Sequence, residues 1–595
     1  MTNNYTRRLK LQFDKDGTPG FNSCTSPESF KQRGFAVLPP HDVIPVIFVP
    51  GIMGSNLMNR KSNEEAWRPP NGKPAALKVA WDARNLSPAD RQELFNAADT
   101  KVDNNGPCNV PDTAYWLTTE EAHRRGWGGL HSDSYLKILL RLEATLNDVC
   151  TLPGLTEERG SQLLPDIGML EYLDGGPDKT KDFRQHAWNT KPDYAAIAKK
   201  AMTAWGARPK ALSIEEIQRL GDYYFPVWAF GYNWLRSNKE AGDLLVKKID
   251  EIIDGYSKIP YFNCVGKVIL VTHSMGGLVG RWAAKEAGGK ILGVVHCVQP
   301  VAGAPVVYRR FRSGTESGAW SFPEKAFAAI VGNDAAKLTP ALAAPGPLEL
   351  LPTRHYPPGW LRVTRRRGMF GEAETLHTLP KSDPYEEIYG KTTDDCWWGM
   401  VDPALLDPAG LHAEVNKPPI EAYDDALTMA RDFHAELQLT AHPQTYGFYG
   451  VDEGKHPAFG HVAWEVTHSG DMPPDLMARK DRGRSLNGHA TVPLKKEIPP
   501  DDLDTAYTLP KTFALLNERN QAGDGTVPAD SGCALERLNP QPKDVINMAG
   551  MDHQNCFDHL PAGQALIYGI ARVIQQAPPP TPPKCMAPPN EGAPT

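Results

Sequence analysis

The chain has 595 residues, of which 41% are hydrophobic and 23% are charged, and its formal net charge is -7. Its length exceeds that of a typical domain, so we expect either several domains or one large domain with insertions. The negative net charge argues against a nucleic-acid-binding protein, and the lack of a run of about 18 apolar residues argues against a membrane-spanning helix.

The first predicted core strand spans residues 43–49, after a polar and turn-rich beginning. That beginning has no apolar stretch of signal-peptide length, so we expect export without a cleaved signal. The strand runs into a glycine-bearing turn at 50–54. Backbone N–H groups of such a turn face the space above the sheet edge, and we predict that Ile52 N–H is an oxyanion donor. The alternative is a loop whose glycines serve only turn geometry.

Two further core strands follow a long first insertion, which contains one amphipathic helix at 134–147. Residues 224–230 form the first of these strands. A helix at 239–254 is predicted to end at Gly255. The apolar, β-branched run at 268–272 is typical of a strand buried on both faces of a parallel sheet.

The sequence His-Ser-Met-Gly-Gly at 273–277 joins this strand to a helix and predicts a nucleophile elbow. Such a turn holds its serine, here Ser274, in a strained conformation that projects Oγ above the sheet. Met275 N–H is the second predicted oxyanion donor. The usual elbow has glycine two residues before the serine, where this chain has Thr272. An ordinary strand-to-helix turn is therefore the alternative.

A lid is predicted in a second insertion, which follows a buried strand at 291–298. The candidate is an aromatic segment at 320–338 that includes Trp320 and a short helix beginning at Pro323. Three basic residues precede it: Arg309, Arg310 and Arg312. These features fit a lid that contacts anionic lipid, and ordinary packing within a cap is the alternative.

The end of the chain supplies a candidate acid and a candidate base. After a strand at 445–450, Asp524 lies in a turn with glycines on both sides. His553 follows a last short strand at 545–548. Ser274, Asp524 and His553 thus occur in the order of an α/β-hydrolase triad, each after a predicted core strand.

This triad has the chemistry that acyl transfer needs. A serine hydroxyl is a poor nucleophile unless an imidazole accepts its proton, and a carboxylate must fix the imidazole tautomer. Asp524 is preferred as the acid because its flanking glycines let the carboxylate project from a sharp turn. The competing residues are His273, His559, Asp530 and Asp552.

Four motifs carry a resemblance to known lipases: V-P-G-I-M-G-S-N-L at 49–57, G-Y-N-W-L-R at 231–236, H-S-M-G-G at 273–277 and G-D-G-T-V-P at 523–528. They resemble the landmarks of lecithin:cholesterol acyltransferase-type and GPI-inositol-deacylase-type lipases. Among these, a large chain with three insertions is similar to the bacterial type VI secretion lipase effectors. The chain departs from the pattern at Thr272 and at Asn233, where the acyltransferases tend to have aspartate.

The resemblance implies a toxin that hydrolyses acyl esters of membrane glycerophospholipids, with phospholipase A1 favoured over A2. It also implies a cognate immunity protein, a secretion-apparatus partner and delivery from the producer's cytoplasm into a target cell. The nine cysteines lack CxxC spacing and are predicted to be buried thiols, and no cofactor or metal is expected. The alternatives are acyl transfer to an acceptor alcohol and a non-catalytic interaction protein with the hydrolase fold.

We therefore predict an α/β-hydrolase core, a mostly parallel sheet with helices on both faces, interrupted by large cap or lid insertions. The predicted segments are the N-terminal segment with the oxyanion turn at 1–59, insertions at 60–220, 306–440 and 451–520, core segments at 221–305, 441–450 and 521–576, and a disordered proline-rich tail at 577–595.

Overall fold

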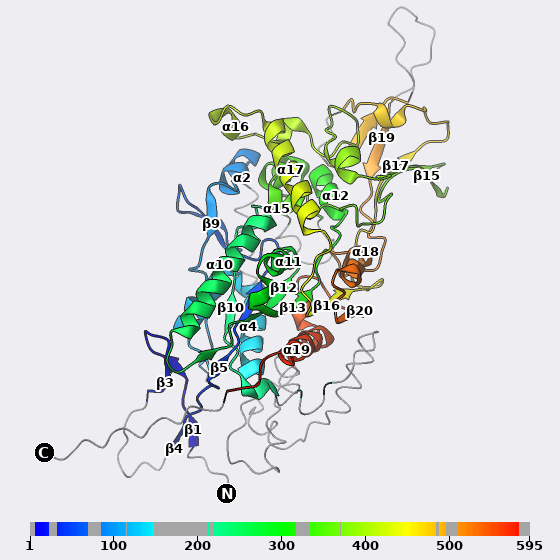
Figure 1. Ribbon diagram of the computed structural model, residues 1–595. Helices are drawn as coiled ribbons and strands as arrows, with labels where there is room; N and C mark the ends of the chain where they lie inside the picture. The colour runs from blue at the N-terminus through cyan, green and yellow to red at the C-terminus, as the bar shows by residue number, and fades with distance from the viewer. Residues whose placement is uncertain are drawn as a thin grey trace, which may run out of the picture.

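A six-stranded parallel sheet forms the centre of the protein (Figure 1). The structure is a computed structural model that describes residues 6–22, 33–69, 85–112, 114, 116–147, 212, 216, 219–316, 328, 332–368, 371–483, 487–494 and 510–581. The strands are, in spatial order, β10 (Val227–Ala229), β6 (Val46–Val49), β12 (Val268–His273), β13 (Ile291–Cys297), β16 (Thr445–Gly450) and β20 (Asp544–Met548). Each strand lies within a predicted strand or extends it by one residue.

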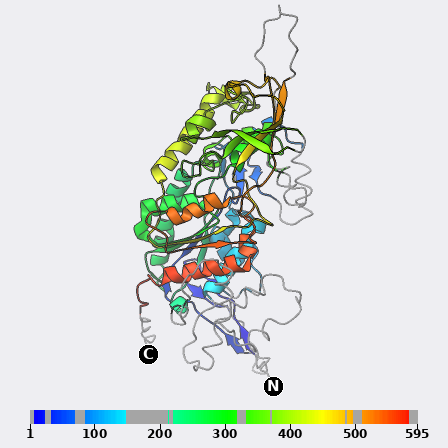
Figure 2. The same ribbon diagram turned by 90° about the vertical axis from the view of Figure 1, so that its right-hand side faces the viewer.

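Successive side chains of β12 enter two different hydrophobic cores, because neighbouring residues of a strand point to opposite faces of the sheet. Val268 and Leu270 belong to the core that also contains residues of α10 (Asn238–Ser257) and α11 (Gly276–Ala287). Ile269 and Val271 belong to the core that contains residues of α4 (Ser132–Asn147) and α19 (Leu560–Ile574). In Figure 2 the red helix α19 lies across the sheet from the green helices α10 and α11. The predicted α/β-hydrolase fold class is confirmed.

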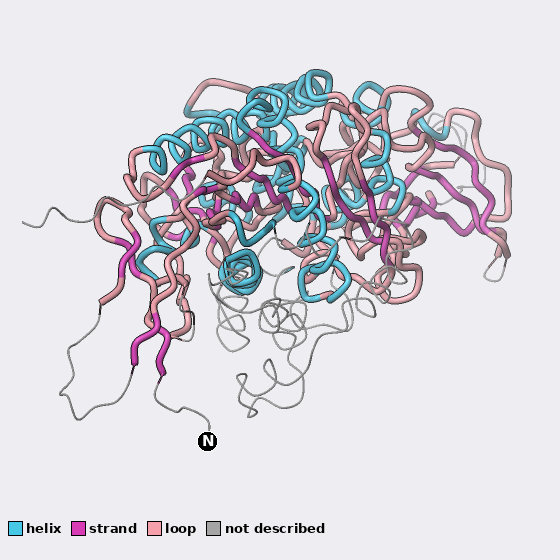
Figure 3. The backbone as a smooth tube through the Cα atoms, turned by 60° about the horizontal axis from the view of Figure 1, so that its bottom comes forward, coloured by secondary structure: helices cyan, strands magenta, loops and turns pink. Residues whose placement is uncertain are grey.

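A second, five-stranded sheet combines parts of two predicted insertions. Its order is β15 (Ala373–Leu379), β14 (Leu361–Arg366), β17 (Val462–Thr467), β19 (Lys511–Leu515) and β18 (His489–Val492). The parallel pairing of β14 with β17 joins the second insertion to the third. In Figure 3 these strands lie apart from those of the central sheet. We call the described residues of these two insertions, 306–440 and 451–520, the cap. The boundaries of the segments stay predictions.

Shorter elements surround the two sheets. Among the described residues, the other α-helices are α2 (Pro88–Leu94), α3 (Thr119–Arg124), α12 (Val306–Ser313), α14 (Ala335–Leu342), α15 (Pro345–Leu348), α16 (Leu411–Glu414), α17 (Pro419–Leu437) and α18 (Ala529–Gly532). A three-stranded sheet contains β8 (Glu65–Trp67), β7 (Leu57–Asn59) and β9 (Thr100–Val102). Helix α10 continues two residues past its predicted end at Gly255, because this glycine does not adopt the left-handed conformation that ends many helices. No helix in the described ranges is long and apolar enough to cross a membrane.

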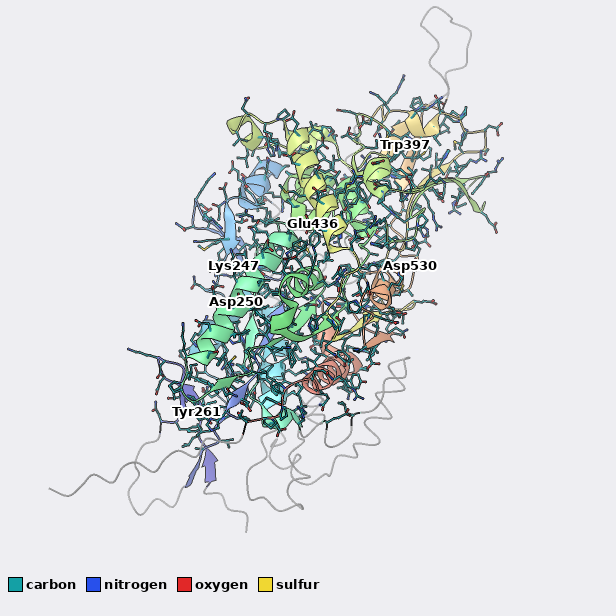
Figure 4. The ribbon with its side chains drawn as sticks, in the orientation of Figure 1. Lys247, Asp250, Tyr261, Trp397, Glu436 and Asp530 are labelled. Carbon is teal, nitrogen blue, oxygen red and sulfur yellow. The ribbon has the colours of Figure 1, made fainter. Side chains whose placement is uncertain are left out.

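Two of the three arginines before the predicted lid, Arg309 and Arg312, are buried in the cap, so the prediction that they contact anionic lipid is wrong for these two. The Arg310 side chain is partly exposed. Arg309 and Arg312 are 6% and 3% exposed. Arg309 and Arg310 both form ion pairs with Glu316 at 3.0 Å. Arg312 donates hydrogen bonds to two cap carbonyl groups, one of them that of Trp397, which Figure 4 labels. Most of the lid segment itself, including Trp320 and the helix expected from Pro323, lies outside the described residues.

The beginning of the predicted disordered tail is docked against the core. The Thr581 backbone N–H and side-chain hydroxyl each donate to the carboxylate of Asp42 at 2.5 Å. The Tyr223 hydroxyl donates to the Pro578 carbonyl. The prediction of disorder is therefore wrong for 577–581, and 582–595 lie outside the described residues. The six cysteines that the structure describes are free thiols, four of them buried.

Candidate active site

Three side chains from the carboxyl edge of the central sheet form one hydrogen-bonded chain. Ser274 Oγ lies 2.9 Å from His553 Nε2, and His553 Nδ1 lies 2.8 Å from Asp524 Oδ2. An ionised carboxylate only accepts hydrogen bonds, so Nδ1 carries the imidazole proton. The lone pair of Nε2 is then free to accept the hydroxyl proton of Ser274. The structure thus brings together the serine, histidine and aspartate predicted from the sequence.

Backbone strain concentrates at neighbouring strand ends of this edge. Ser274, directly after β12, has φ of 52°, and Val298, directly after β13, has φ of 49°. Met53, in the turn after β6, has φ of 62°. Positive φ is uncommon for residues other than glycine and rare for a β-branched one such as valine. Strain of this kind persists where the surrounding packing fixes the backbone, which is common at functional sites.

The carboxylate of Asp524 is oriented by its own turn. The carboxylate is 1% exposed, and Oδ1 accepts the backbone N–H groups of Thr526 at 3.0 Å and Val527 at 2.7 Å. These two bonds leave Oδ2 facing His553. Gly525, with φ of 90°, supplies the left-handed residue that the tight turn requires.

Two opposing effects act on the pKa of His553. Burial is the largest effect and alone would lower the pKa, because it disfavours the charged imidazolium. The charge of Asp524 and its hydrogen bond outweigh burial and raise the pKa of His553 above its usual value of 6.5. The ring is therefore a stronger proton acceptor than an isolated imidazole.

None of the competing residues takes the place of His553 or Asp524 among the described residues. His559 is the N-cap residue of α19, and Asp530 lies on α18 (Figure 4). The Asp552 carboxylate accepts from Asn555 instead of contacting the His553 side chain. The ring nitrogens of His273, the histidine adjoining Ser274, contact the Tyr135 hydroxyl and the backbone carbonyl of His553.

The turn that carries one of the two predicted oxyanion donors comes close to the serine. A Cβ atom on Gly51 would lie 2.8 Å from Ser274 Cβ, so the turn after β6 approaches Ser274 as closely as only glycine permits. Met275 is the N-cap residue of α11, where helix N–H groups are unpaired. Within the part of the chain that the structure describes, neither Ile52 N–H nor Met275 N–H donates a hydrogen bond. The assignment of these two donors stays a prediction.

Comparison with known proteins adds a structural relative. No protein-family profile and no curated protein matches the chain. A solved structure does match: a chain of the crystal structure of the Tle4–Tli4 complex is 26% identical, with a TM-score of 0.64. The match covers 91% of this chain and all of that chain. The chain is similar to the type VI secretion lipase effector Tle4. The predicted resemblance to such effectors is confirmed, and with it the coarse assignment to lipolytic hydrolases.

The Tle4-like core accommodates its unusual elbow residue through a glycine on the facing helix. A Cβ atom on Gly280 of α11 would lie only 2.6 Å from Thr272 Cγ2. The Thr272 hydroxyl forms a 2.7 Å hydrogen bond with His296 Nδ1, so the side chain is fixed and cannot turn away. The small residue that close strand–helix packing requires is thus on the helix instead of the strand.

Sequence reasoning missed Asp452, which connects the acid turn to the histidine turn. It follows β16 at the same edge of the sheet, and its backbone pairs with Gly523 in both directions, at 2.8 and 3.1 Å. Its Oδ2 accepts Gly550 N–H at 2.5 Å, three residues before His553. An acidic residue two positions after a predicted core strand was the available signal.

We expect Gly280→Ala to lower the free energy of unfolding by about 1–3 kcal/mol, because the new methyl group overlaps Thr272 Cγ2 in a closely packed interface. In a helix without such an overlap, replacing glycine by alanine stabilises the protein by about 1 kcal/mol, so a decrease in the free energy of unfolding would indicate a steric clash. Thr272→Ser removes Cγ2 and keeps the hydroxyl. In that background Gly280→Ala should cost less, as measured by denaturant unfolding of all four proteins. Equal costs in both backgrounds would contradict a steric fit between Thr272 and Gly280.

Proposed function

We propose that the protein is a serine phospholipase of the A type that hydrolyses acyl esters of membrane glycerophospholipids, at the sn-1 position in preference to sn-2. The observation that carries the proposal is the hydrogen-bonded chain of Ser274, His553 and Asp524. The similarity to the lipase effector Tle4 supports a lipid ester as the substrate.

In the proposed mechanism, Ser274 Oγ attacks the acyl carbonyl carbon while His553 Nε2 accepts the hydroxyl proton. Ile52 N–H and Met275 N–H stabilise the negative charge that develops on the carbonyl oxygen. His553 then gives its proton to the departing lysophospholipid oxygen, which leaves an acyl group on Ser274. A water molecule, deprotonated by His553, hydrolyses this ester and restores the serine.

The negative charge of Asp524 favours the two proton-transfer steps. When His553 accepts the serine proton, a positive imidazolium forms in a buried site, where an isolated charge is costly. The carboxylate, 2.8 Å away, stabilises this charge and keeps Nε2 directed at Ser274.

The proposal extends to the biology of an effector. The matched structure is a complex of Tle4 with Tli4, and this supports a cognate immunity protein for the present chain and its secretion into a target cell. We include a secretion-apparatus partner in the proposal on the same basis.

We expect Ser274→Ala to lower turnover by on the order of 10⁴-fold or more without unfolding the protein. The measurement is fatty acid release from vesicles of a phosphatidylcholine whose two acyl chains differ, which also identifies the position cleaved. A fluorophosphonate should label the parent protein but not the variant. Asp552→Asn, next to His553 but outside the triad, is the control and should retain activity. Release by Ser274→Ala at the parent rate would refute the proposal.

The pH dependence of kcat/KM is expected to follow His553. Below its pKa the imidazole is protonated and cannot accept the serine proton, so activity should rise with pH through a value above 6.5. Asp524→Asn removes the charge that raises this pKa. The remaining activity, lower by about 10²–10⁴-fold, should therefore have its acid limb at lower pH than in the parent. An unchanged acid limb on a soluble p-nitrophenyl ester would exclude Asp524 as the partner of His553.

A further inference from the structure

Two buried tyrosine hydroxyls hold opposite ends of one peptide group beside the candidate active site. The Gly51 N–H donates to the Tyr135 hydroxyl oxygen at 3.1 Å. The Tyr232 hydroxyl donates to the Pro50 carbonyl oxygen at 2.9 Å. Both tyrosines are 1% exposed. Because a peptide group is planar, fixing its N–H and its C=O fixes its orientation up to the Cα atom of Gly51, from which the chain continues into Ile52.

The bonds of Tyr135 continue to the backbone of His553 in a fixed direction. The His553 carbonyl can only accept, so His273 Nε2, 3.0 Å away, must carry the proton. His273 Nδ1 is then an acceptor, and the Tyr135 hydroxyl, 2.9 Å away, must donate to it. The hydroxyl oxygen remains free to accept the Gly51 N–H. One chain of donors therefore runs from the turn after β6 to His553.

His273 is well suited to this connecting position because it stays neutral. Burial, with a smaller contribution from His553, lowers the pKa of His273 to about 3. A neutral ring has one donor and one acceptor nitrogen, as the directed chain requires. The His553 backbone is also held on its other side, where its N–H donates to the Asp524 carbonyl at 2.8 Å.

We propose that Tyr135, Tyr232 and His273 are positioning residues, which hold the oxyanion turn in register with the Ser274–His553 pair. The inference rests on the proposed function. None of these three side chains is hydrogen-bonded to Ser274 Oγ or to a ring nitrogen of His553, whose partners are one another and Asp524. Oxyanion donors act only within a few tenths of an ångström of the correct place, and a shift of about 1 Å can cost about 10²-fold in rate.

A matched variant in the cap distinguishes the effect of losing a positioning hydrogen bond from the general effect of removing a buried tyrosine hydroxyl. The Tyr423 hydroxyl donates to the Tyr389 carbonyl at 2.9 Å in the cap, and this tyrosine is 2% exposed. Tyr423→Phe therefore removes a bond of the same type, length and burial as Tyr232→Phe. Its effect on thermal stability should match that of Tyr232→Phe.

The kinetic test uses a soluble p-nitrophenyl ester. Tyr135→Phe and Tyr232→Phe should each lower kcat by about 10- to 100-fold and leave KM within about twofold, because the donors act on the transition state. Tyr423→Phe should leave both constants unchanged. An unchanged kcat in either active-site variant, or an equal loss in Tyr423→Phe, would overturn the proposal.

Two replacements of His273 test the connection to His553. Glutamine places an amide N–H near the position of Nε2, whereas asparagine reaches only to the position of Nδ1. His273→Gln should therefore keep kcat within about tenfold of the parent, and His273→Asn should lose as much as Tyr135→Phe or more. Equal losses in the two variants would overturn the part of the proposal that concerns the His553 carbonyl.

Amide hydrogen exchange tests the positioning without turnover. Tyr135→Phe should speed exchange at Gly51, whose N–H donates to the Tyr135 hydroxyl, whereas Tyr423→Phe should not. This result is expected even if the parent protein fails to hydrolyse phospholipid, so failure of the proposed function is distinguishable. Equal protection of the Gly51 N–H in Tyr135→Phe and in the parent would refute the proposal that Tyr135 holds this turn.

Discussion

The parallel pairing of the central strands is the constraint on which the site depends. Parallel strands all end at one edge of a sheet, so the turns after β6, β12 and β20 emerge at the same edge although almost 500 residues separate β6 from β20. The pairing of β12 with its neighbours cannot shift by one residue without moving its side chains from one core to the other, because residues along β12 alternate between the two cores. The same register between β6 and β12 therefore also fixes how far the turns that carry Ile52 and Ser274 extend beyond the edge of the sheet.

The core and the reacting side chains were predictable because their signals are local. A strand buried on both faces is a short apolar run, and a serine between such a run and a helix that begins with two glycines is typical of a nucleophile elbow. Asp524 and His553 could be assigned because they follow Ser274 in the expected order, Asp524 in a turn with glycines on both sides and His553 after the last core strand. The end of the helix was predicted at Gly255, two residues too early, because a glycine allows a left-handed conformation without requiring one.

The cap could not be predicted in the same way because its contacts join distant segments. Arg312 looks like a free surface charge in the sequence, and only the fold brings the carbonyl groups of Trp397 and Gly399 against it. The pairing of β14 with β17 crosses about a hundred residues, including the return to the central sheet at β16. Tyr135 belongs to an amphipathic helix, and nothing in its spacing there shows that its hydroxyl reaches Gly51 and His273.

The contact between Thr581 and Asp42 has a consequence for the way the molecule can be handled. Asp42 lies in β5 (Asp42–Val43), just before the amino end of β6, whereas Ser274 lies at the carboxyl ends of the strands. A reporter or affinity label joined after residue 581 therefore starts from the edge of the sheet opposite the serine. Attachment there keeps the label away from the candidate active site, and a label joined within the cap does not share this advantage.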